Sequence, residues 1–150
     1  AGLARAAGLR FDTAAALHNL GDIHDRLGEH PRAYAAFVES LELTKTLEQD
    51  RLTNLNQMHL CLLDGLRSPE GADERLKTLI RYADAKGYLW DVLEGRFLLA
   101  RLATAHGEHD KARKLVEEVA EMAADYGHRL IEEDAKQLSK QLGSVAPGSD

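Results

Sequence analysis

The chain has 150 residues, enough for one domain with a buried core, and its net charge is −6. This charge gives no electrostatic reason to expect binding to nucleic acid or to an anionic membrane. The single cysteine, Cys61, excludes an intrachain disulfide and a thiolate metal cluster, which makes a cytoplasmic location the default. No apolar run approaches the roughly 20 residues that span a bilayer. Abundant Ala, Leu, Glu and Arg favour an all-α protein.

At the start of the chain, residues 2–7 have the pattern of the last turns of a helix, and the next repeat begins at Gly8. We therefore expect the chain to be a piece of a longer helical array. Two amphipathic helices follow, with Gly28 at the turn between them, and Gly87 and Gly127 are typical left-handed stops of later helices. The seven predicted helices span residues 11–27, 30–47, 50–66, 70–86, 88–105, 108–126 and 128–142.

The same helix pair recurs along the chain with a period of about 40 residues, which is in the range of helical repeat proteins. Successive copies begin at Gly8, Glu48, Gly87 and Gly127. The second half of the pair recurs as well, because GEHPRAYAAF from Gly28 corresponds to GEHDKARKLV from Gly107. One pair cannot bury both of its apolar faces, so adjacent pairs are expected to stack into a continuous core. Small residues at equivalent positions allow close helix contacts, namely Gly21, Ala33, Ala100 and Ala112.

At these positions the sequence resembles the tetratricopeptide repeat family. The long period, about 40 residues, resembles the variety found in bacterial signalling and regulatory proteins. The middle copy is degenerate around Pro69 and Gly71. The resemblance implies a right-handed αα-superhelix whose concave groove binds peptides or partner proteins, and it implies no catalysis. The signature residues are Leu17, Leu20, Gly21, Gly28, Ala33 and Phe37 in the first copy, and Leu99, Ala100, Gly107, Ala112 and Val116 in the third.

This resemblance predicts one repeat domain over residues 1–142, made of three helix pairs and a C-terminal cap helix. The cap helix carries a charged face that suits the open end of a solenoid. Residues 143–150 are predicted to be a disordered tail. The three repeats and the cap helix cover residues 8–47, 48–86, 87–126 and 127–142.

The resemblance also places partner-binding residues on the first helix of each repeat, where they would line the groove. These residues are His18, Asn19, Asp22, Asp25, Arg26, Met58, Leu62, Phe97 and Arg101. An acidic mouth beside an apolar middle suits a basic amphipathic helix, or an extended peptide with apolar anchors. Some family members clamp a terminal carboxylate, but the corresponding positions hold His18 and Asp22, which argues against that activity. The other interpretation is that these side chains only fill the space between repeats.

Other residue patterns give no comparable signal for chemistry. His106 and His109 are three positions apart, but His109 is repeat-equivalent to His30, which favours a shared structural role at a turn. The sequence has no Gly-rich phosphate loop, no HExxH and no strand-to-helix elbow. Cys61 falls on a packing position, which indicates a buried thiol. We therefore expect no catalytic residue, no metal site and no cofactor.

The sequence thus favours a non-enzymatic protein–protein interaction module, as a regulatory fragment of a larger bacterial signalling or transcription-control protein. The expected partner is a protein or a peptide, and neither nucleic acid nor a membrane is expected. The alternative is a homotypic assembly module, in which the open solenoid ends associate and form a homodimer. Partner binding predicts sensitivity at Asp22 and Phe97, whereas assembly predicts sensitivity at Leu3, Leu9 or the last helix.

Overall fold

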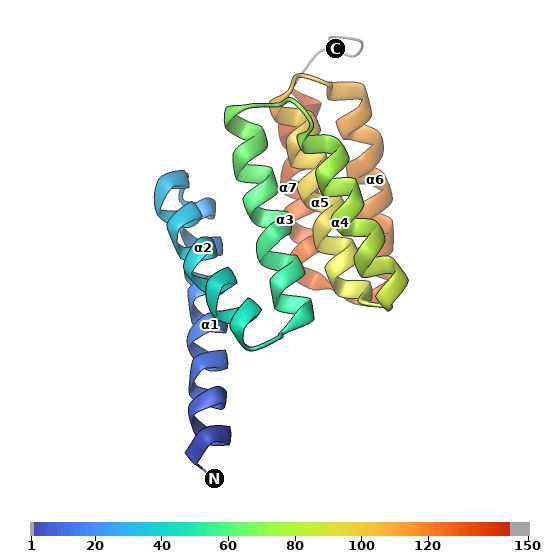
Figure 1. The fold of residues 1–150 in the computed structure, drawn as a ribbon. Coiled ribbons are helices and arrows are strands. Elements are labelled where there is room, and N and C mark those ends of the chain that lie inside the picture. The colour runs from blue at the N-terminus through green and yellow to red at the C-terminus, as the bar shows by residue number, and fades with distance from the viewer. Residues whose placement is uncertain (1, 145–150) are drawn as a thin grey trace. The chain divides into compact units, whose positions relative to one another are not determined.

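Helices fill most of the chain, as its helix-forming composition favours. The computed structural model describes residues 2–144, apart from the side chain of Ala4. Within that range the chain forms seven helices and no strand (Figure 1). None of these helices has both the length and the apolar character needed to cross a membrane. The helices are α1 (Gly2–Arg26), α2 (His30–Thr46), α3 (Asp50–Arg67), α4 (Ala72–Lys86), α5 (Leu89–Ala105), α6 (His109–Tyr126) and α7 (Arg129–Gly143).

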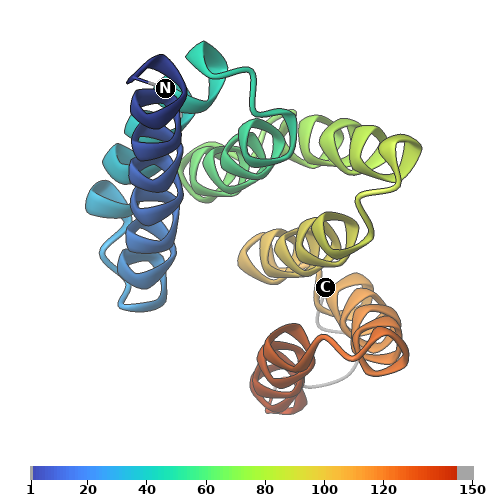
Figure 2. The ribbon, with the colours of Figure 1, turned by 90° about the horizontal axis from the view of Figure 1, so that it is seen from below.

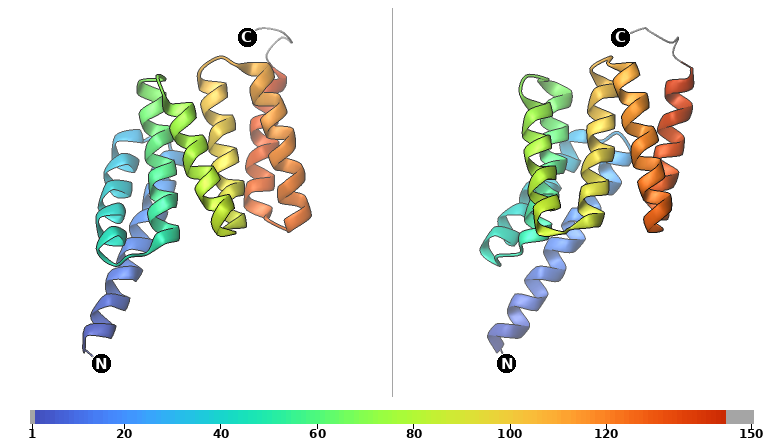
Figure 3. Two further views of the ribbon diagram at one scale, coloured as in Figure 1. Left: turned by 45° about the vertical axis from the view of Figure 1, so that its right-hand side comes forward. Right: turned by 90° about the vertical axis from the view of Figure 1, so that its right-hand side faces the viewer.

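The chain divides into two compact units, and the boundary falls inside α3, after Leu63. In the first unit α1 packs against α2, and the first half of α1 extends past the end of α2 (Figure 3). Close approach of these two helices depends on Gly21, because a Cβ atom there would lie 2.9 Å from ring atoms of Phe37. The Phe37 side chain is fully buried. The first unit is therefore built around the contact between Gly21 and Phe37.

In the second unit the helices pack in chain order, α4 against α5, α5 against α6 and α6 against α7. The last helix also contacts α5, and Figure 2 shows it next to both α5 and α6. Leu93 and Ala100 of α5 join Val119 of α6 and Leu138 of α7 in one buried cluster. The expected all-α fold is confirmed for the described residues, and the packing of neighbouring helices is consistent with a tetratricopeptide-like helical solenoid.

The predicted repeat is visible in the burial pattern and in the turns. Gly28 and Gly107, which occupy equivalent positions in the first and third copies, both have φ of +76° and follow the first helices of their pairs. Four of the five buried positions of α2 are also buried at the equivalent positions of α6; the exception is Ala36, whose equivalent Leu115 is partly buried. The four positions are Ala33, Phe37, Ser40 and Thr44 in α2, and Ala112, Val116, Val119 and Ala123 in α6.

The prediction for the first residues of the chain is wrong. Residues 2–7 do not end a separate helix, because α1 runs without a break through Gly8 to Arg26. Gly8 does not have a positive φ, and a Cβ atom there would meet no other atom within 4 Å. A glycine in such a position does not interrupt a helix; it only lowers its helix propensity. Of the predicted tail, residues 145–150 lie outside the described residues, and α7 continues to Gly143.

The second helices of the repeats end in the same way, although the first of them has Glu48 at the turn where the other two have glycine. Gly87 and Gly127 have φ of +76° and +73°, as expected for left-handed helix stops. At the equivalent turn Glu48 has φ of +54°, and it is the one non-glycine residue with positive φ among residues 2–144. The backbone N–H of Gln49 still donates to the carbonyl oxygen of Thr44 at 2.9 Å, which completes the same capping motif. Glu48 therefore holds a strained conformation that glycine would adopt freely.

We expect Glu48→Gly to raise the free energy of unfolding by about 0.5–1 kcal/mol, because glycine removes the cost of the left-handed conformation. The matched control is Glu42→Gly on the exposed face of α2. That change should lower the free energy of unfolding by about 1 kcal/mol through lost helix propensity. Urea titrations followed by circular dichroism measure both changes, and equal effects of the two substitutions would contradict this interpretation.

Candidate functional site

The predicted partner-binding residue His18 belongs to a buried chain of hydrogen bonds within the first unit. Its Nδ1–H donates to Oδ1 of Asn56 at 2.8 Å, which fixes the tautomer because the amide oxygen can only accept. The Asn56 amide in turn donates to Oγ of Ser40 at 2.9 Å, and the Ser40 hydroxyl donates to the carbonyl oxygen of Ala14 at 2.7 Å. His18 is therefore a residue that joins α1, α2 and α3.

Aromatic rings enclose this chain of hydrogen bonds. Phe37 stacks against His59 with 4.7 Å between ring centroids. The His18 ring packs edge-on against each of these two rings, with 5.2 Å between ring centroids in both cases. His18, Phe37 and His59 are all buried. The imidazole of His18 is thus held rigidly, and only its margin faces solvent. A partner protein that bound here would contact the exposed edge of the His18 ring in a fixed position.

The predicted acidic residues of α1 have different environments. Asp22 is partly exposed, and Nε of Arg26 lies 3.0 Å from its Oδ2. Asp25 is buried, and its Oδ1 lies 3.6 Å from Nε2 of His30. The two carboxylates and the imidazole of His59 have ligand atoms within 4.8 Å of one another, a spacing that a metal ion requires. Arg26 lies beside the carboxylate of Asp22, and the imidazole of His30 lies beside that of Asp25.

The other predicted site residues divide into exposed and buried groups. Asn19 is exposed on α1, the same helix that carries the partly exposed Asp22. Met58 and Leu62 on α3 are fully buried. In the second unit Phe97 and Arg101 are partly buried on α5, and Phe97 packs against the buried cluster. The polar members near Asp22 are therefore the part of the predicted set that is open to solvent.

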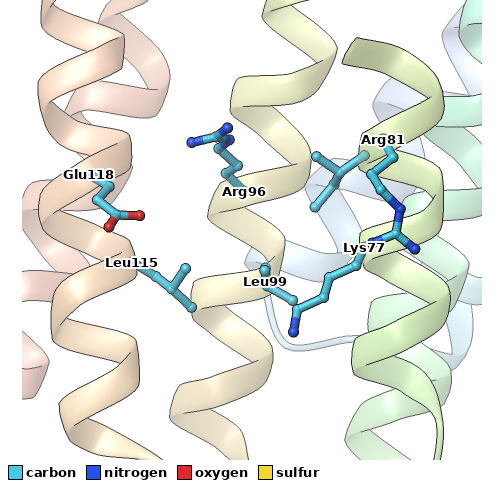
Figure 4. Close-up of a pocket in the computed structure, with 7 residues that line it drawn as sticks. Lys77, Arg81, Arg96, Leu99, Leu115 and Glu118 are labelled. Atoms are coloured by element: carbon cyan, nitrogen blue, oxygen red, sulfur yellow. The ribbon is translucent and has the colours of Figure 1, made fainter. Parts of the chain in front are cut away.

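A hollow of about 240 Å³ lies in the second unit between α4 and α6, and α5 forms part of its wall (Figure 4). Its floor is apolar and its rim carries three cationic side chains and one carboxylate. Nζ of Lys77 lies 2.8 Å from Oδ2 of Asp73, and Nη1 of Arg96 lies 3.4 Å from Sδ of Met122, so both cations have neighbours inside the protein. The residues that line the hollow are Lys77, Ile80, Arg81, Arg96, Leu99, Leu115 and Glu118.

Asp73 ties α4 to α6 beside this hollow. Its carboxylate accepts from Lys77 at 2.8 Å and from Lys111 at 3.2 Å. Burial raises the pKa of Asp73, but the hydrogen bonds and charges of the two lysines outweigh it and hold the pKa below the ordinary value of 3.8. The hydrogen bond from Asp73 raises the pKa of Lys77. The charged form of this cluster is therefore the one that the folded state favours.

A carboxylate whose pKa is lower in the folded state than in the unfolded state stabilises the fold above the unfolded-state pKa. This stabilisation is lost as the pH falls through the folded-state pKa. We therefore expect the free energy of unfolding to decrease as the pH falls below about 5, and to decrease less steeply in Asp73→Asn. Asp125→Asn, on the exposed face of α6, is the matched control and should keep the wild-type slope. An unchanged slope in Asp73→Asn would contradict the assignment.

The structural role of His106 was not evident from the sequence, whereas the burial of Cys61 was predicted. Nε2–H of His106 donates to the carbonyl oxygen of Gly65 at 3.0 Å, so the imidazole joins the turn after α5 to α3. Cys61 is buried, as its packing position predicted. The hollow was not predicted, although Lys77 and Arg81 occupy one face of α4 at a spacing of four positions.

Comparison with known proteins identifies a family for part of the chain. A family model described as Tetratricopeptide repeat matches residues 16–51, which cover the second half of α1, all of α2 and the start of α3. No curated protein matches the chain significantly. The matched segment includes His18, Asp22 and Phe37 and ends just inside the second predicted repeat, which begins at Glu48.

Proposed function

We propose that this chain, whose residues 16–51 form a tetratricopeptide repeat, binds a peptide or a helix of a partner protein on the first helices of its repeats. Tetratricopeptide repeats are protein–protein interaction modules, and the family is a non-enzymatic scaffold. The observation that carries the proposal is the family match over α1, which holds the solvent-accessible part of the predicted site. Asp22 and Asn19 are the residues there that a partner would contact first.

The chemistry of the partner follows from the charge and the packing of these residues. The carboxylate of Asp22 is partly exposed, and the chain as a whole is acidic. A partner with lysine or arginine side chains would gain from this field during association. In the second unit Phe97, which is partly buried on α5, offers apolar area of its own to a partner that binds there. We therefore favour a basic amphipathic segment as the ligand.

The wider context belongs to the same proposal. We infer that the chain is a regulatory part of a larger bacterial signalling or transcription-control protein and acts in the cytoplasm. The long-period variety of repeat, which the internal spacing favours, is typical of that context.

Peptide selection tests the proposal. A random peptide library is panned against the wild-type protein, and the affinities of the recovered peptides are measured by fluorescence anisotropy. We expect basic peptides with apolar anchors, and an affinity loss of at least about tenfold in Asp22→Lys, because the substitution sets two cations against the ligand. Asp125→Lys, on the exposed face of α6, is the matched control and should bind like the wild type. Equal binding by both variants would refute a site at Asp22.

A further inference from the structure

An exposed apolar stripe runs along α1 on the side that does not face α2. Its members follow one another at alternating spacings of four and three positions, which is the spacing of a coiled-coil seam. Each of them is exposed in the structure, with Leu9, Ile23 and Leu27 each more than half exposed. The stripe consists of Leu9, Thr13, Ala16, Leu20 and Ile23 of α1, and of Leu27 in the turn that directly follows the helix.

The repeat shows what this face of a first helix does elsewhere in the chain. Leu99 and Leu102 of α5 are the repeat equivalents of Leu20 and Ile23, and they are buried in the second unit. Leu102 reaches α3, where its Cδ1 atom would lie 2.6 Å from a Cβ atom at Gly65. The same positions therefore serve helix packing in α5 and are uncovered in α1. A helix is the natural occupant of the stripe.

We propose that the occupant is α1 of a second copy of this chain, in an antiparallel pair with a two-fold axis at the level of His18. The stripe adjoins the partner-binding residues, and Arg26 takes part in both surfaces. The occupant proposed here is a second copy and not a peptide, so the proposal goes beyond the proposed function. In this pairing the small residues of the seam meet large ones, which fills it without voids. The layers pair Leu9 with Leu27 of the second copy, Thr13 with its Ile23 and Ala16 with its Leu20.

Charge complementarity supports the same pairing. Asp12 and Arg26 are exposed and lie along the same edge of the stripe, each one position before a seam residue. In the antiparallel pair Asp12 faces Arg26 of the second copy, and the two-fold axis repeats this contact at the other end. Arg26 has donors for both Asp22 and this second carboxylate, because a guanidinium carries five N–H groups. A parallel pair would set Ala16 against Ala16 and would not bring Asp12 and Arg26 together.

The interface is isologous, so it closes at two copies and does not extend into a filament. Leu9 takes part in it from the first half of α1, the half that extends past α2 (Figure 3). That overhang would otherwise leave apolar side chains in water, with Leu3 and Leu9 exposed at 90% and 62%. Dimer formation would bury Leu9 of each copy against Leu27 of the other.

Sedimentation velocity over about 1 μM to about 1 mM tests the proposal without any peptide ligand. We expect a concentration-dependent dimer in the wild-type protein and a dissociation constant raised at least about a hundredfold in Leu20→Glu, which places a charge in the central layers. Leu130→Glu, at a similarly exposed leucine of α7, is the matched control and should dimerise like the wild type. A wild-type protein that stays monomeric throughout, or a dimer that survives Leu20→Glu, would overturn the proposal.

Charge exchange tests the antiparallel register. Asp12→Arg and Arg26→Asp should each weaken their own homodimer about tenfold, because like charges then face each other at both ends. An equimolar mixture of the two variants should form a heterodimer with affinity near that of the wild type, because both pairs are attractive again. Failure of the mixture to recover the dimer would overturn this register. Peptide binding by Asp22→Lys is measured in a separate experiment, so the failure of one proposal can be distinguished from the failure of the other.

Discussion

Phe37→Ala is expected to lower the free energy of unfolding by about 3–5 kcal/mol, the usual cost of removing a fully buried phenylalanine. Phe37 fills the space above Gly21 and stacks on His59 at 4.7 Å, so its removal leaves a cavity between α1, α2 and α3. Urea titration followed by circular dichroism measures the change.

The matched control is Phe11→Ala on the first half of α1. Phe11 is 37% exposed and lies before Ala14, where the buried face of α1 begins, so we expect a loss below about 1 kcal/mol. A similar loss from both substitutions would mean that the contact between α1 and α2 is not the core of the first unit. The repeat equivalence of Phe37 and Val116 would then have no explanation in packing.

Gly65→Val is expected to be strongly disruptive in the second unit, with a loss of about 1–3 kcal/mol from overpacking. A Cβ atom at Gly65 would lie 2.6 Å from Cδ1 of Leu102 and 2.7 Å from Cβ of Ala72. Leu102 can change rotamer, but Ala72 has no rotamer to change, so α4 itself would have to move. The carbonyl oxygen of Gly65 also accepts from His106, and this bond fixes the same region.

Gly8→Ala is the matched control for this substitution. A Cβ atom at Gly8 meets nothing within 4 Å, so alanine should add about 0.5–1 kcal/mol through its better helix propensity. The two glycines are therefore expected to give opposite signs in the same denaturant titration. A stabilising Gly65→Val would show that the close contact among α3, α4 and α5 is not tight in solution.

The periodic residues of the sequence predicted most of the helix pairing. The repeat period placed Ala33 and Ala112, and Gly28 and Gly107, in equivalent positions. The prediction from the repeat period is successful because close helix packing requires small residues, and the turns require glycines with positive φ, at fixed positions in each repeat. The continuous helix through Gly8 was missed, because glycine marks a stop only where the backbone turns.

The candidate site was less accessible from the sequence. In the hydrogen-bond chain, His18 and Asn56 are 38 positions apart in the sequence, and Asn56 and Ser40 are 16 positions apart. No local sequence pattern predicts contacts over such separations. Asp25 was assigned to an acidic mouth by register alone, but the structure buries it beside His30. Register determines which face of a helix a residue occupies, whereas burial depends on what the neighbouring helices cover.

The exposed stripe on α1 illustrates the same difference. Leu20 and Leu99 occupy equivalent positions in the repeat, yet Leu20 is 43% exposed and Leu99 is buried. The sequence predicts that both lie on a packing face. Only the structure shows that this face is covered by other helices in α5 and is open in α1.

The most direct test of partner binding on the first helices is a map of the peptide-binding surface by backbone amide chemical shifts. The isotope-labelled protein is titrated with a peptide from the selection described above. We expect the largest shifts on first helices, around Asn19 and Asp22 of α1 and around Phe97 and Arg101 of α5. Shifts confined to α4 and α6, for example around the hollow beside Lys77, would contradict this expectation and would place the partner on the second helices.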